Sequence, residues 1–179
     1  MKDITVFENF LTDEEFSLTL DIIEKSSWKF GETSLNMGPP FWNMDLMSQK
    51  DYINTILNKI NDKTGKTFQA FRVYANGQTY GQDGNFHPDS DDDNCYTLLI
   101  YISDISPTNI DTVGGFTQFK LNNGQILNIN PYQNNAVFFK SNIIHRGLAP
   151  SRETGMLRIT LAFKLYENST GTPFIISYT

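Results

Sequence analysis

Residues 95–103, Cys95-Tyr96-Thr97-Leu98-Leu99-Ile100-Tyr101-Ile102-Ser103, form a nearly unbroken apolar run with many aromatic and β-branched side chains. Such a run, followed by a polar segment, predicts a buried strand over about 96–103. Other short apolar or alternating runs lie on both sides of it, separated by Gly, Asn, Asp and Pro, at 68–74, 116–119, 125–129, 136–140, 157–166 and 174–178. Several short strands at this spacing are typical of a sandwich or barrel.

The first third of the chain is predicted to be mainly helical. Thr12 is a candidate helix N-cap, and Glu15 completes a capping box, after which apolar residues recur with helical spacing to about residue 25. A second helix is predicted over about 48–63. The Gly-, Pro- and aromatic-rich stretch 31–43 between the two helices is predicted to be a loop.

Helices followed by strands predict an α+β chain, mainly β, with N-terminal helices packed on one face of a sheet. The sequence has no linker, repeat or low-complexity segment that would divide it. We therefore expect a single domain over 1–179, with a helical part at about 12–65 and a β part at about 66–179.

Composition limits the function classes. The net charge of −6 argues against binding to nucleic acid, which needs a basic surface. The single cysteine, Cys95, cannot form an internal disulfide. No apolar run reaches the roughly 20 residues of a membrane span, and the N-terminus lacks the pattern of a secretory signal. We therefore expect a cytoplasmic location and no membrane partner.

The chain has two histidines, His87 and His145, and Asp89 lies two residues after the first of them. Residues two apart at the end of a strand point to the same side, so His87 and Asp89 can face one cavity. Two imidazoles and a carboxylate can occupy one face of an iron octahedron and leave three positions open. This pattern predicts a non-haem iron site made by His87, Asp89 and His145.

Simpler interpretations exist for the same residues. A His-x-Asp triplet occurs by chance, and an isolated histidine is more often a surface or core residue than a ligand. The acidic run Asp91-Asp92-Asp93 is typical of a solvated loop, and it lacks the glycine and the distal glutamate of a calcium-binding EF-hand.

A series of further segments, in order along the chain, resembles the 2-oxoglutarate/Fe(II)-dependent dioxygenases, especially their prolyl 4-hydroxylase-like branch. The resemblance extends from about Tyr74 to Phe163. The segments that carry it, beside His87-Pro88-Asp89, are Arg72-Val73-Tyr74-Ala75-Asn76-Gly77-Gln78, the run at 95–103, Gly114-Gly115-Phe116-Thr117-Gln118-Phe119, Ala136-Val137-Phe138-Phe139, His145-Arg146-Gly147-Leu148-Ala149-Pro150 and Arg158-Ile159-Thr160-Leu161.

This resemblance implies a double-stranded β-helix, or jelly roll, with Fe(II) at its mouth, 2-oxoglutarate as cosubstrate, O2, and ascorbate as a reductant. By position, His87, Asp89 and His145 correspond to the iron ligands, and Arg158 to the residue that binds the distal carboxylate of 2-oxoglutarate. A guanidinium suits that role because it offers two parallel donors to a carboxylate. The other implied cosubstrate-binding residues are Tyr74, Tyr101 and Thr160.

One departure from the family concerns the basic anchor. Many prolyl 4-hydroxylases have a lysine ten residues after the second histidine, and that position is Gly155 here. We assign the role to Arg158, which opens an apolar strand, rather than to Arg152, which lies in a polar turn.

The resemblance favours hydroxylation of a prolyl residue in a peptide or protein, with a free amino acid or small metabolite as the alternative substrate. The run 89–93 is expected near the pocket mouth, where it would favour a basic or neutral substrate. Rival classes are a cupin-like metal-binding jelly roll, a zinc hydrolase with the same ligands, a non-catalytic interaction module and a nucleic-acid demethylase.

Overall fold

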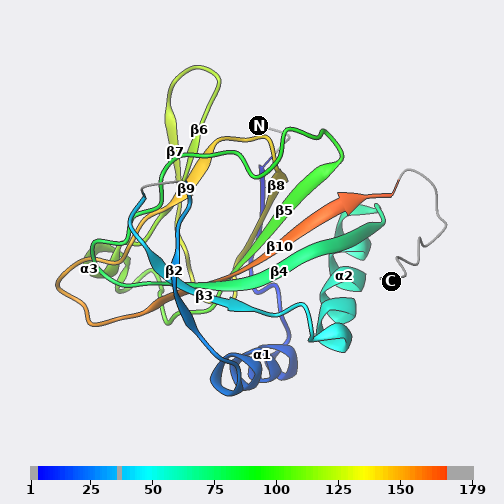
Figure 1. Cartoon of the computed structure of the whole chain (residues 1–179), viewed down its shortest axis with the longest axis horizontal. Coiled ribbons are helices and arrows are strands. Elements are labelled where there is room, and N and C mark those ends of the chain that lie inside the picture. Colours follow the sequence, from blue (N-terminus) through cyan, green and yellow to red (C-terminus); the bar gives the residue numbers. More distant parts are fainter. Residues whose placement is uncertain (1–3, 36–37, 169–179) are drawn as a thin grey trace.

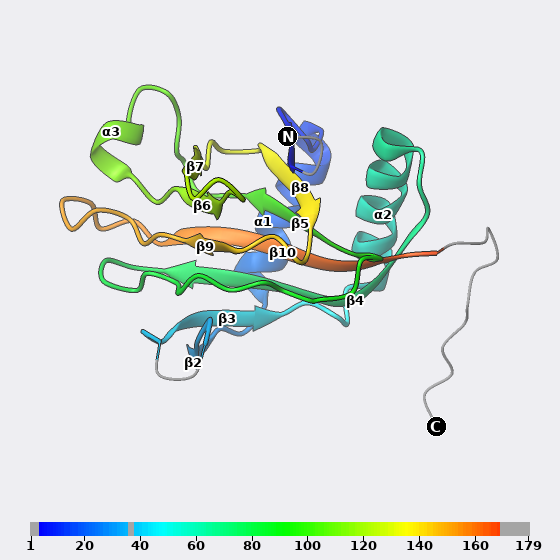
Figure 2. The same cartoon turned by 90° about the horizontal axis from the view of Figure 1, so that it is seen from above.

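The computed structural model describes residues 4–35 and 38–168. This part of the chain contains two antiparallel sheets, with strand orders β1-β8-β5-β10-β4-β3-β2 and β7-β6-β9. Figure 2 shows β8, β5, β10, β4 and β3 in succession across the larger sheet. The elements in chain order are β1 (Ile4–Phe7), α1 (Asp13–Lys25), β2 (Lys29–Glu32), β3 (Phe41–Asp45), α2 (Lys50–Thr64), β4 (Phe68–Gln78), β5 (Cys95–Tyr101), α3 (Ile110–Val113), β6 (Thr117–Lys120), β7 (Ile126–Ile129), β8 (Ala136–Lys140), β9 (His145–Gly147) and β10 (Arg158–Glu167) (Figure 1).

The centre of the larger sheet is β10, which pairs with β5 on one side and β4 on the other. Every residue of β5 is buried, as expected for a strand covered on both faces. Side chains of β10 alternate between those two faces. Leu161, Phe163 and Leu165 belong to the core on the helical side, whereas Arg158, Thr160, Ala162 and Lys164 line a pocket on the other side.

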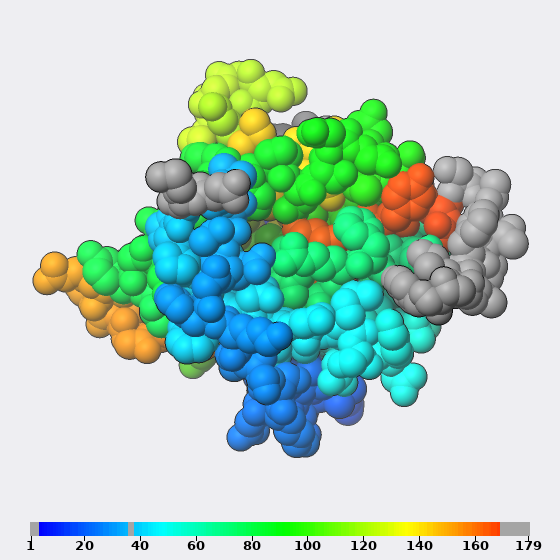
Figure 3. All heavy atoms as spheres, viewed as in Figure 1, coloured from blue at the N-terminus to red at the C-terminus, as the bar shows by residue number. Residues whose placement is uncertain are grey.

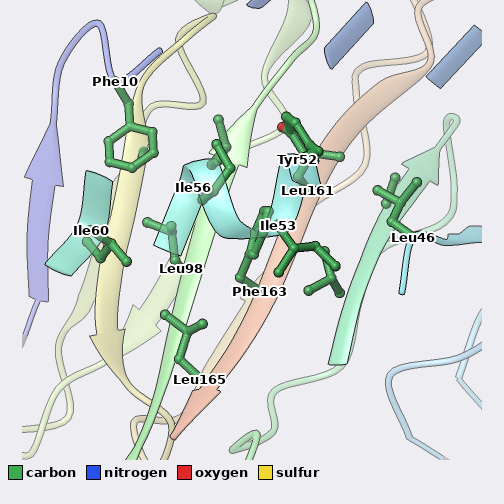
Figure 4. Packing of buried hydrophobic residues seen from close by; sticks show 14 of the residues in the cluster. Phe10, Leu46, Tyr52, Ile53, Ile56, Ile60, Leu98, Leu161, Phe163 and Leu165 are labelled. Atoms are coloured by element: carbon green, nitrogen blue, oxygen red, sulfur yellow. The ribbon is translucent and has the colours of Figure 1, made fainter. Parts of the chain in front are cut away.

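Helices α1 and α2 cover one face of the larger sheet. Helix α1 begins at the capping box of Thr12 and Glu15, which confirms that prediction. Helix α2 ends at Gly65, whose φ of 68° suits a residue without a side chain. Its buried residues pack against the strands in the main core (Figure 4), where the labelled side chains include Tyr52, Ile53, Ile56 and Ile60 of α2 and Leu98, Leu161, Phe163 and Leu165 of β5 and β10.

The smaller sheet packs on the face of the larger sheet that α1 and α2 leave uncovered. A smaller apolar cluster lies between the two sheets and includes Tyr101 and Ala162 from the larger sheet and Phe119 from β6. Strands β6 and β7 form a hairpin that projects from the body of the molecule (Figure 1). This two-sheet arrangement, with helices on one outer face, confirms the predicted mainly β fold class.

One sequence prediction in the N-terminal third was wrong. Residues 31–43, predicted as a loop, include the end of β2 and the first part of β3, and both strands extend the larger sheet next to β4. Strand β1 lies at the other edge, beside β8. The part at 12–65 is therefore not purely helical. The strand expected at 174–178 lies outside the described residues.

Within the described residues, no helix is both long enough and apolar enough to span a membrane.

Candidate functional site

The structure brings His87, Asp89 and His145 together. The backbones of the two histidines form an isolated antiparallel bridge, with N–H to carbonyl distances of 3.0 Å in both directions. The backbone N–H of Asp89 donates to the carbonyl of Ser141 at 2.7 Å, which fixes the carboxylate beside the bridge. One ligand atom from each side chain lies within 4.8 Å of the others.

Both imidazoles present the same nitrogen to this cluster. Nδ1 of His87 lies 2.8 Å from the carbonyl of Asn85, and Nδ1 of His145 lies 2.9 Å from the carbonyl of Ile143. Since a carbonyl only accepts, each Nδ1 donates and leaves the Nε2 lone pair free. The two Nε2 atoms lie 3.6 Å and 3.4 Å from the Asp89 carboxylate. Backbone bonds of this kind commonly orient histidine ligands of metals.

Asp89 is buried and strongly held in its ionised form. The Thr97 hydroxyl donates to its Oδ2 at 2.6 Å, and the ammonium of Lys164 forms a salt bridge with the same oxygen. Burial alone would raise the pKa of Asp89, but the interaction with the nearby His87 imidazole and the charge of Lys164 outweigh it and hold this pKa far below its ordinary value. The carboxylate is therefore available as a ligand.

The two histidines differ in their electrostatics. Burial lowers the pKa of His145 to about 4, and the nearby Asp89 charge offsets only part of this. Burial also acts to lower the pKa of His87, but the interaction with the nearby Asp89 carboxylate and the hydrogen bond with the carbonyl of Asn85 outweigh it, so that pKa is raised. His145 is thus a neutral imidazole at neutral pH, the form that binds metals.

Arg158 lies at the inner end of the same pocket and is 3% exposed. Its Nε donates to the Gly115 carbonyl at 2.6 Å, and Nη1 donates to Gln78 and Thr160 at 2.9 Å each. Nη2 donates to the Thr117 hydroxyl at 3.1 Å. All four acceptors are neutral. Within the described part of the chain, Arg158 forms no salt bridge.

A buried guanidinium without a counter-ion costs free energy, and burial accordingly lowers its pKa. Four of its five N–H groups donate to oxygens of the protein, so one N–H on Nη2 remains to bind an anion. Thr117 and Thr160 accept from Arg158, and their own hydroxyl protons can therefore point to the same anion. Arg158 and these hydroxyls suit the distal carboxylate of 2-oxoglutarate.

The other predicted residues lie in different surroundings. Tyr74 and Thr160 line the pocket. Tyr101 is not among the lining residues; it is buried behind the wall and its hydroxyl donates to Thr117 at 2.9 Å. Burial raises the pKa of Tyr101 to about 12, so it acts as a hydrogen-bond donor that orients Thr117. Arg152 is exposed and does not line the pocket.

Several site residues were not found from the sequence. These residues hold either Asp89 or Arg158, and they are Gln78, Thr97, Gly115, Thr117 and Lys164. Strand alternation from Arg158 predicts that Lys164 faces the pocket, but a lysine in a strand usually extends to solvent. The hydrogen bonds to Gln78 and Thr117 depend on sheet register, which the sequence does not provide.

One pocket, with a volume of about 310 Å³, is lined by both the His-Asp-His cluster and the surroundings of Arg158. Its wall contains His87, Asp89 and His145 as well as Arg158, together with apolar side chains such as Phe41, Leu99 and Ala162. In the space-filling view, orange-red atoms of β10 are visible at the centre of one face, between green segments (Figure 3). A cavity of this size accommodates a small cosubstrate.

This chain is similar to known proteins in its three-dimensional structure, and the sequence comparisons found no match, neither a family model nor a curated protein sequence. A 2OG-Fe(II) oxygenase family oxidoreductase from Burkholderia pseudomallei has a TM-score of 0.75 at 9% identity, covering 92% of this chain and 85% of that one. This chain shares its fold.

Two further solved structures support the same conclusion. A prolyl hydroxylase from Trichoplax adhaerens, in complex with a hypoxia inducible factor peptide, has a TM-score of 0.68 at 14% identity and covers 92% of this chain and 84% of its own. HygX from Streptomyces hygroscopicus, with nickel, 2-oxoglutarate and hygromycin B bound, has a TM-score of 0.66 at 11% identity, covering 92% and 82%. The predicted jelly-roll fold is therefore confirmed.

Proposed function

We propose that this chain is an Fe(II)- and 2-oxoglutarate-dependent oxygenase that hydroxylates an organic substrate. One observation carries the proposal: a His-Asp-His cluster lines the same pocket as a buried guanidinium that has no carboxylate partner among the residues the structure describes. The cluster supplies the donor set of a non-haem iron site. The guanidinium supplies a site for an organic anion.

The roles of the residues follow from their contacts. His87, Asp89 and His145 would hold Fe(II), and Arg158, with Thr117 and Thr160, would bind the far carboxylate of 2-oxoglutarate. When bound, iron and 2-oxoglutarate supply the means to activate O2, with succinate and CO2 as co-products.

The remaining pocket residues prepare this site. Thr97 and the backbone of Ser141 fix the orientation of the Asp89 carboxylate. Tyr101 fixes Thr117. Leu99 and Ala162 make part of the wall apolar, which limits water around the reacting groups. The protein thus provides orientation and partial exclusion of water.

For the substrate, we propose a prolyl residue in a peptide or protein, with a free amino acid or small metabolite as the alternative. The resemblance of the sequence to the prolyl 4-hydroxylase-like branch and the fold of the Trichoplax enzyme support the first choice. The similarity to HygX, which has hygromycin B bound, supports keeping the second.

The test is an anaerobic titration of the protein with Fe(II) and then 2-oxoglutarate, followed by visible absorption. We expect a weak charge-transfer band with 1:1 stoichiometry that requires both additions. Admission of O2 should then yield succinate, and the yield should rise when a substrate is present. Ascorbate should extend the number of turnovers.

Two outcomes for the His145→Ala variant sharpen this test. The variant should lose the absorption band and most Fe(II) binding, because it removes the more buried of the two histidine ligands. Full succinate formation by His145→Ala would reject the proposed ligand set. In the unmodified protein, metal binding without any response to 2-oxoglutarate would instead support a cupin-like protein or a zinc hydrolase.

A further inference from the structure

Two cations face each other across β4 and β10 at the outer part of the pocket. Lys164 of β10 is the direct register partner of Arg72 of β4. Directly opposed residues on antiparallel strands lie on the same face, with Cβ atoms about 5 Å apart. Both residues line the pocket. The Lys164 Nζ and the Arg72 guanidinium lie 5.7 Å and 4.4 Å from the centroid of the Tyr74 ring.

Like charges in this position repel each other, and each is now balanced by a separate carboxylate. Lys164 is buried and pairs with Asp89. Arg72 is half-exposed and pairs with Glu32 at 3.1 Å, where both side chains are open to solvent. An exposed pair of this kind contributes little stability and is easily exchanged.

The balance changes when Asp89 serves as a metal ligand. Lys164 and the metal would then share the single negative charge of this carboxylate, even where each binds a different oxygen, and the ammonium has no other anionic partner among the described residues. It does retain the neutral hydroxyl of Thr97 at 3.5 Å. A buried ammonium that lies beside a guanidinium and is only partly neutralised in this way forms a site for an anion.

The formal charges of the pocket lead to the same conclusion. Its wall carries three cations, Arg72, Arg158 and Lys164, and two carboxylates, Glu32 and Asp89, which leaves one surplus positive charge with both imidazoles neutral. A divalent iron and a doubly charged 2-oxoglutarate cancel each other. The surplus therefore persists in the loaded pocket and corresponds to one carboxylate rather than to a phosphate, which carries nearly two negative charges.

We propose that Lys164 and Arg72 bind a carboxylate of the substrate, so that this protein acts on an acid. The inference rests on the proposed oxygenase function and specifies its substrate class. It reverses the expectation that the acidic run favours a basic or neutral substrate. Asp91, Asp92 and Asp93 are exposed and do not line the pocket, to which the acidic residues of this run contribute Asp89 alone.

The experiment uses pairs of probes that differ only in charge. N-acetyl-L-proline, N-acetyl-L-leucine and N-acetyl-L-phenylalanine are each compared with their carboxamides, and the peptide acetyl-Pro-Glu-amide with acetyl-Pro-Gln-amide. Each probe is titrated anaerobically into the protein loaded with Fe(II) and 2-oxoglutarate, and the change in the visible band reports binding without turnover. Succinate formation in air is then measured with the same probes.

We expect the acid of at least one pair to bind about tenfold more tightly than its amide, the usual scale for a hydrogen bond to a charged group. Lys164→Met should abolish this difference, and Lys164→Arg should keep it. Arg72→Gln should reduce the difference between acid and amide. Because Arg72 is not paired with a proposed metal ligand, this variant keeps the test decisive even if Lys164→Met folds poorly. Lys25→Met, on the exposed surface of α1, is the control and should match the unmodified protein.

The outcomes separate this inference from the proposed function. Absence of the absorption band in the unmodified protein would contradict the oxygenase itself. A normal band with no acid-selective response in any pair would overturn the inference alone. Full acid selectivity in both Lys164→Met and Arg72→Gln would overturn it as well.

Discussion

Arg158 shows at the scale of one residue how the pocket is prepared for an anion. Four of its N–H groups are used by neutral oxygens of the protein, which fixes the orientation of the guanidinium before a ligand arrives. The expectation of two parallel donors to a carboxylate is therefore too simple. In the proposed complex, one N–H group and two threonine hydroxyls would share that task.

This arrangement predicts the behaviour of two arginine variants. Arg158→Ala should raise the Kd for 2-oxoglutarate by about 10- to 100-fold, since hydrogen bonds to charged groups contribute about 1.5–3 kcal/mol. Fe(II) binding should persist. Arg152→Ala removes an exposed arginine outside the pocket and should leave this Kd unchanged. Titration of the visible band measures both, and the opposite result would transfer the anchor to Arg152.

Gly115 supports the same guanidinium through its lack of a side chain. Its φ is +77°, and an added Cβ would lie 3.0 Å from Cδ of Arg158. Gly115→Ala should force Arg158 off its rotamer at a cost of about 0.5–1.5 kcal/mol and weaken 2-oxoglutarate binding by up to about tenfold.

Gly124 provides the matched control for this substitution. Its φ of +82° imposes the same backbone strain on alanine, but nothing lies within 4 Å of the added Cβ. Gly124→Ala should therefore lower thermal stability to a similar extent while leaving the Kd for 2-oxoglutarate unchanged. Equal loss of binding in both variants would show that strain alone, and not contact with Arg158, is responsible.

The sequence predicted the ligand residues better than the residues that hold them. His87 and Asp89 are two apart and the histidines are the only two in the chain, and the ordered resemblance of the surrounding segments supported their selection. The role of Lys164 was not predicted, because its buried position depends on the sheet that covers it and on the carboxylate of Asp89, which is distant in the sequence. A contact between residues that lie so far apart in the chain leaves no local pattern.

At the scale of a secondary-structure element, the start of helix α1 is fixed by two local hydrogen bonds. The Thr12 hydroxyl accepts from the Glu15 N–H at 3.3 Å, and the Glu15 carboxylate accepts from the Thr12 N–H at 2.8 Å. Thr12→Ala should destabilise the protein by about 1 kcal/mol, which lowers Tm by roughly 2–4 °C in a chain of this length. Thermal unfolding followed by circular dichroism measures this.

Thr55→Ala is the control for this cap. Thr55 is exposed within α2 and its hydroxyl donates only to the preceding turn, at the carbonyl of Asp51. Alanine is the better helix former in such a position. Tm should therefore stay constant or rise slightly, and an equal fall in both variants would contradict the role given to the capping box.

Elements with a clear local pattern, which include both long helices and most of the strands after residue 66, were predicted from the sequence, whereas β2 and β3 were not. The N-cap of α1 and the apolar stripe of α2 lie within one segment each. Strands β2 and β3 lie among Gly, Pro and exposed aromatic residues, and β3 is a strand because it pairs with β4 from Trp42 opposite Gly77 to Asp45 opposite Tyr74. That partner is about 30 residues away, and periodicity within the segment does not reveal it.

At the scale of the whole molecule, the pocket joins the two sheets. His145 belongs to β9 of the smaller sheet, and Arg158 belongs to β10 of the larger one. A metal with 2-oxoglutarate would therefore add a further connection between two sheets that already meet through packing and through side-chain hydrogen bonds such as those to Thr117. Ligands that bind the folded state alone must raise the stability of the entire chain.

The size of that stabilisation can be predicted. At concentrations 100-fold above Kd, a ligand adds about 2.7 kcal/mol, which corresponds to a rise in Tm of roughly 5–11 °C for a domain of this size. Anaerobic calorimetry with Fe(II) and 2-oxoglutarate measures it. EDTA should reverse the rise, and the His145→Ala variant should not show it. An unchanged Tm at saturation would contradict a site formed between the two sheets.

The salt bridge between Lys164 and Asp89 also bears on how the protein matures. Because the ammonium already neutralises the carboxylate, a newly made polypeptide can complete its fold before any iron reaches it. If Asp89 holds iron as proposed, loading would add a second cation at this carboxylate inside a finished cavity, and a cell short of iron would accumulate intact apoprotein rather than misfolded chains.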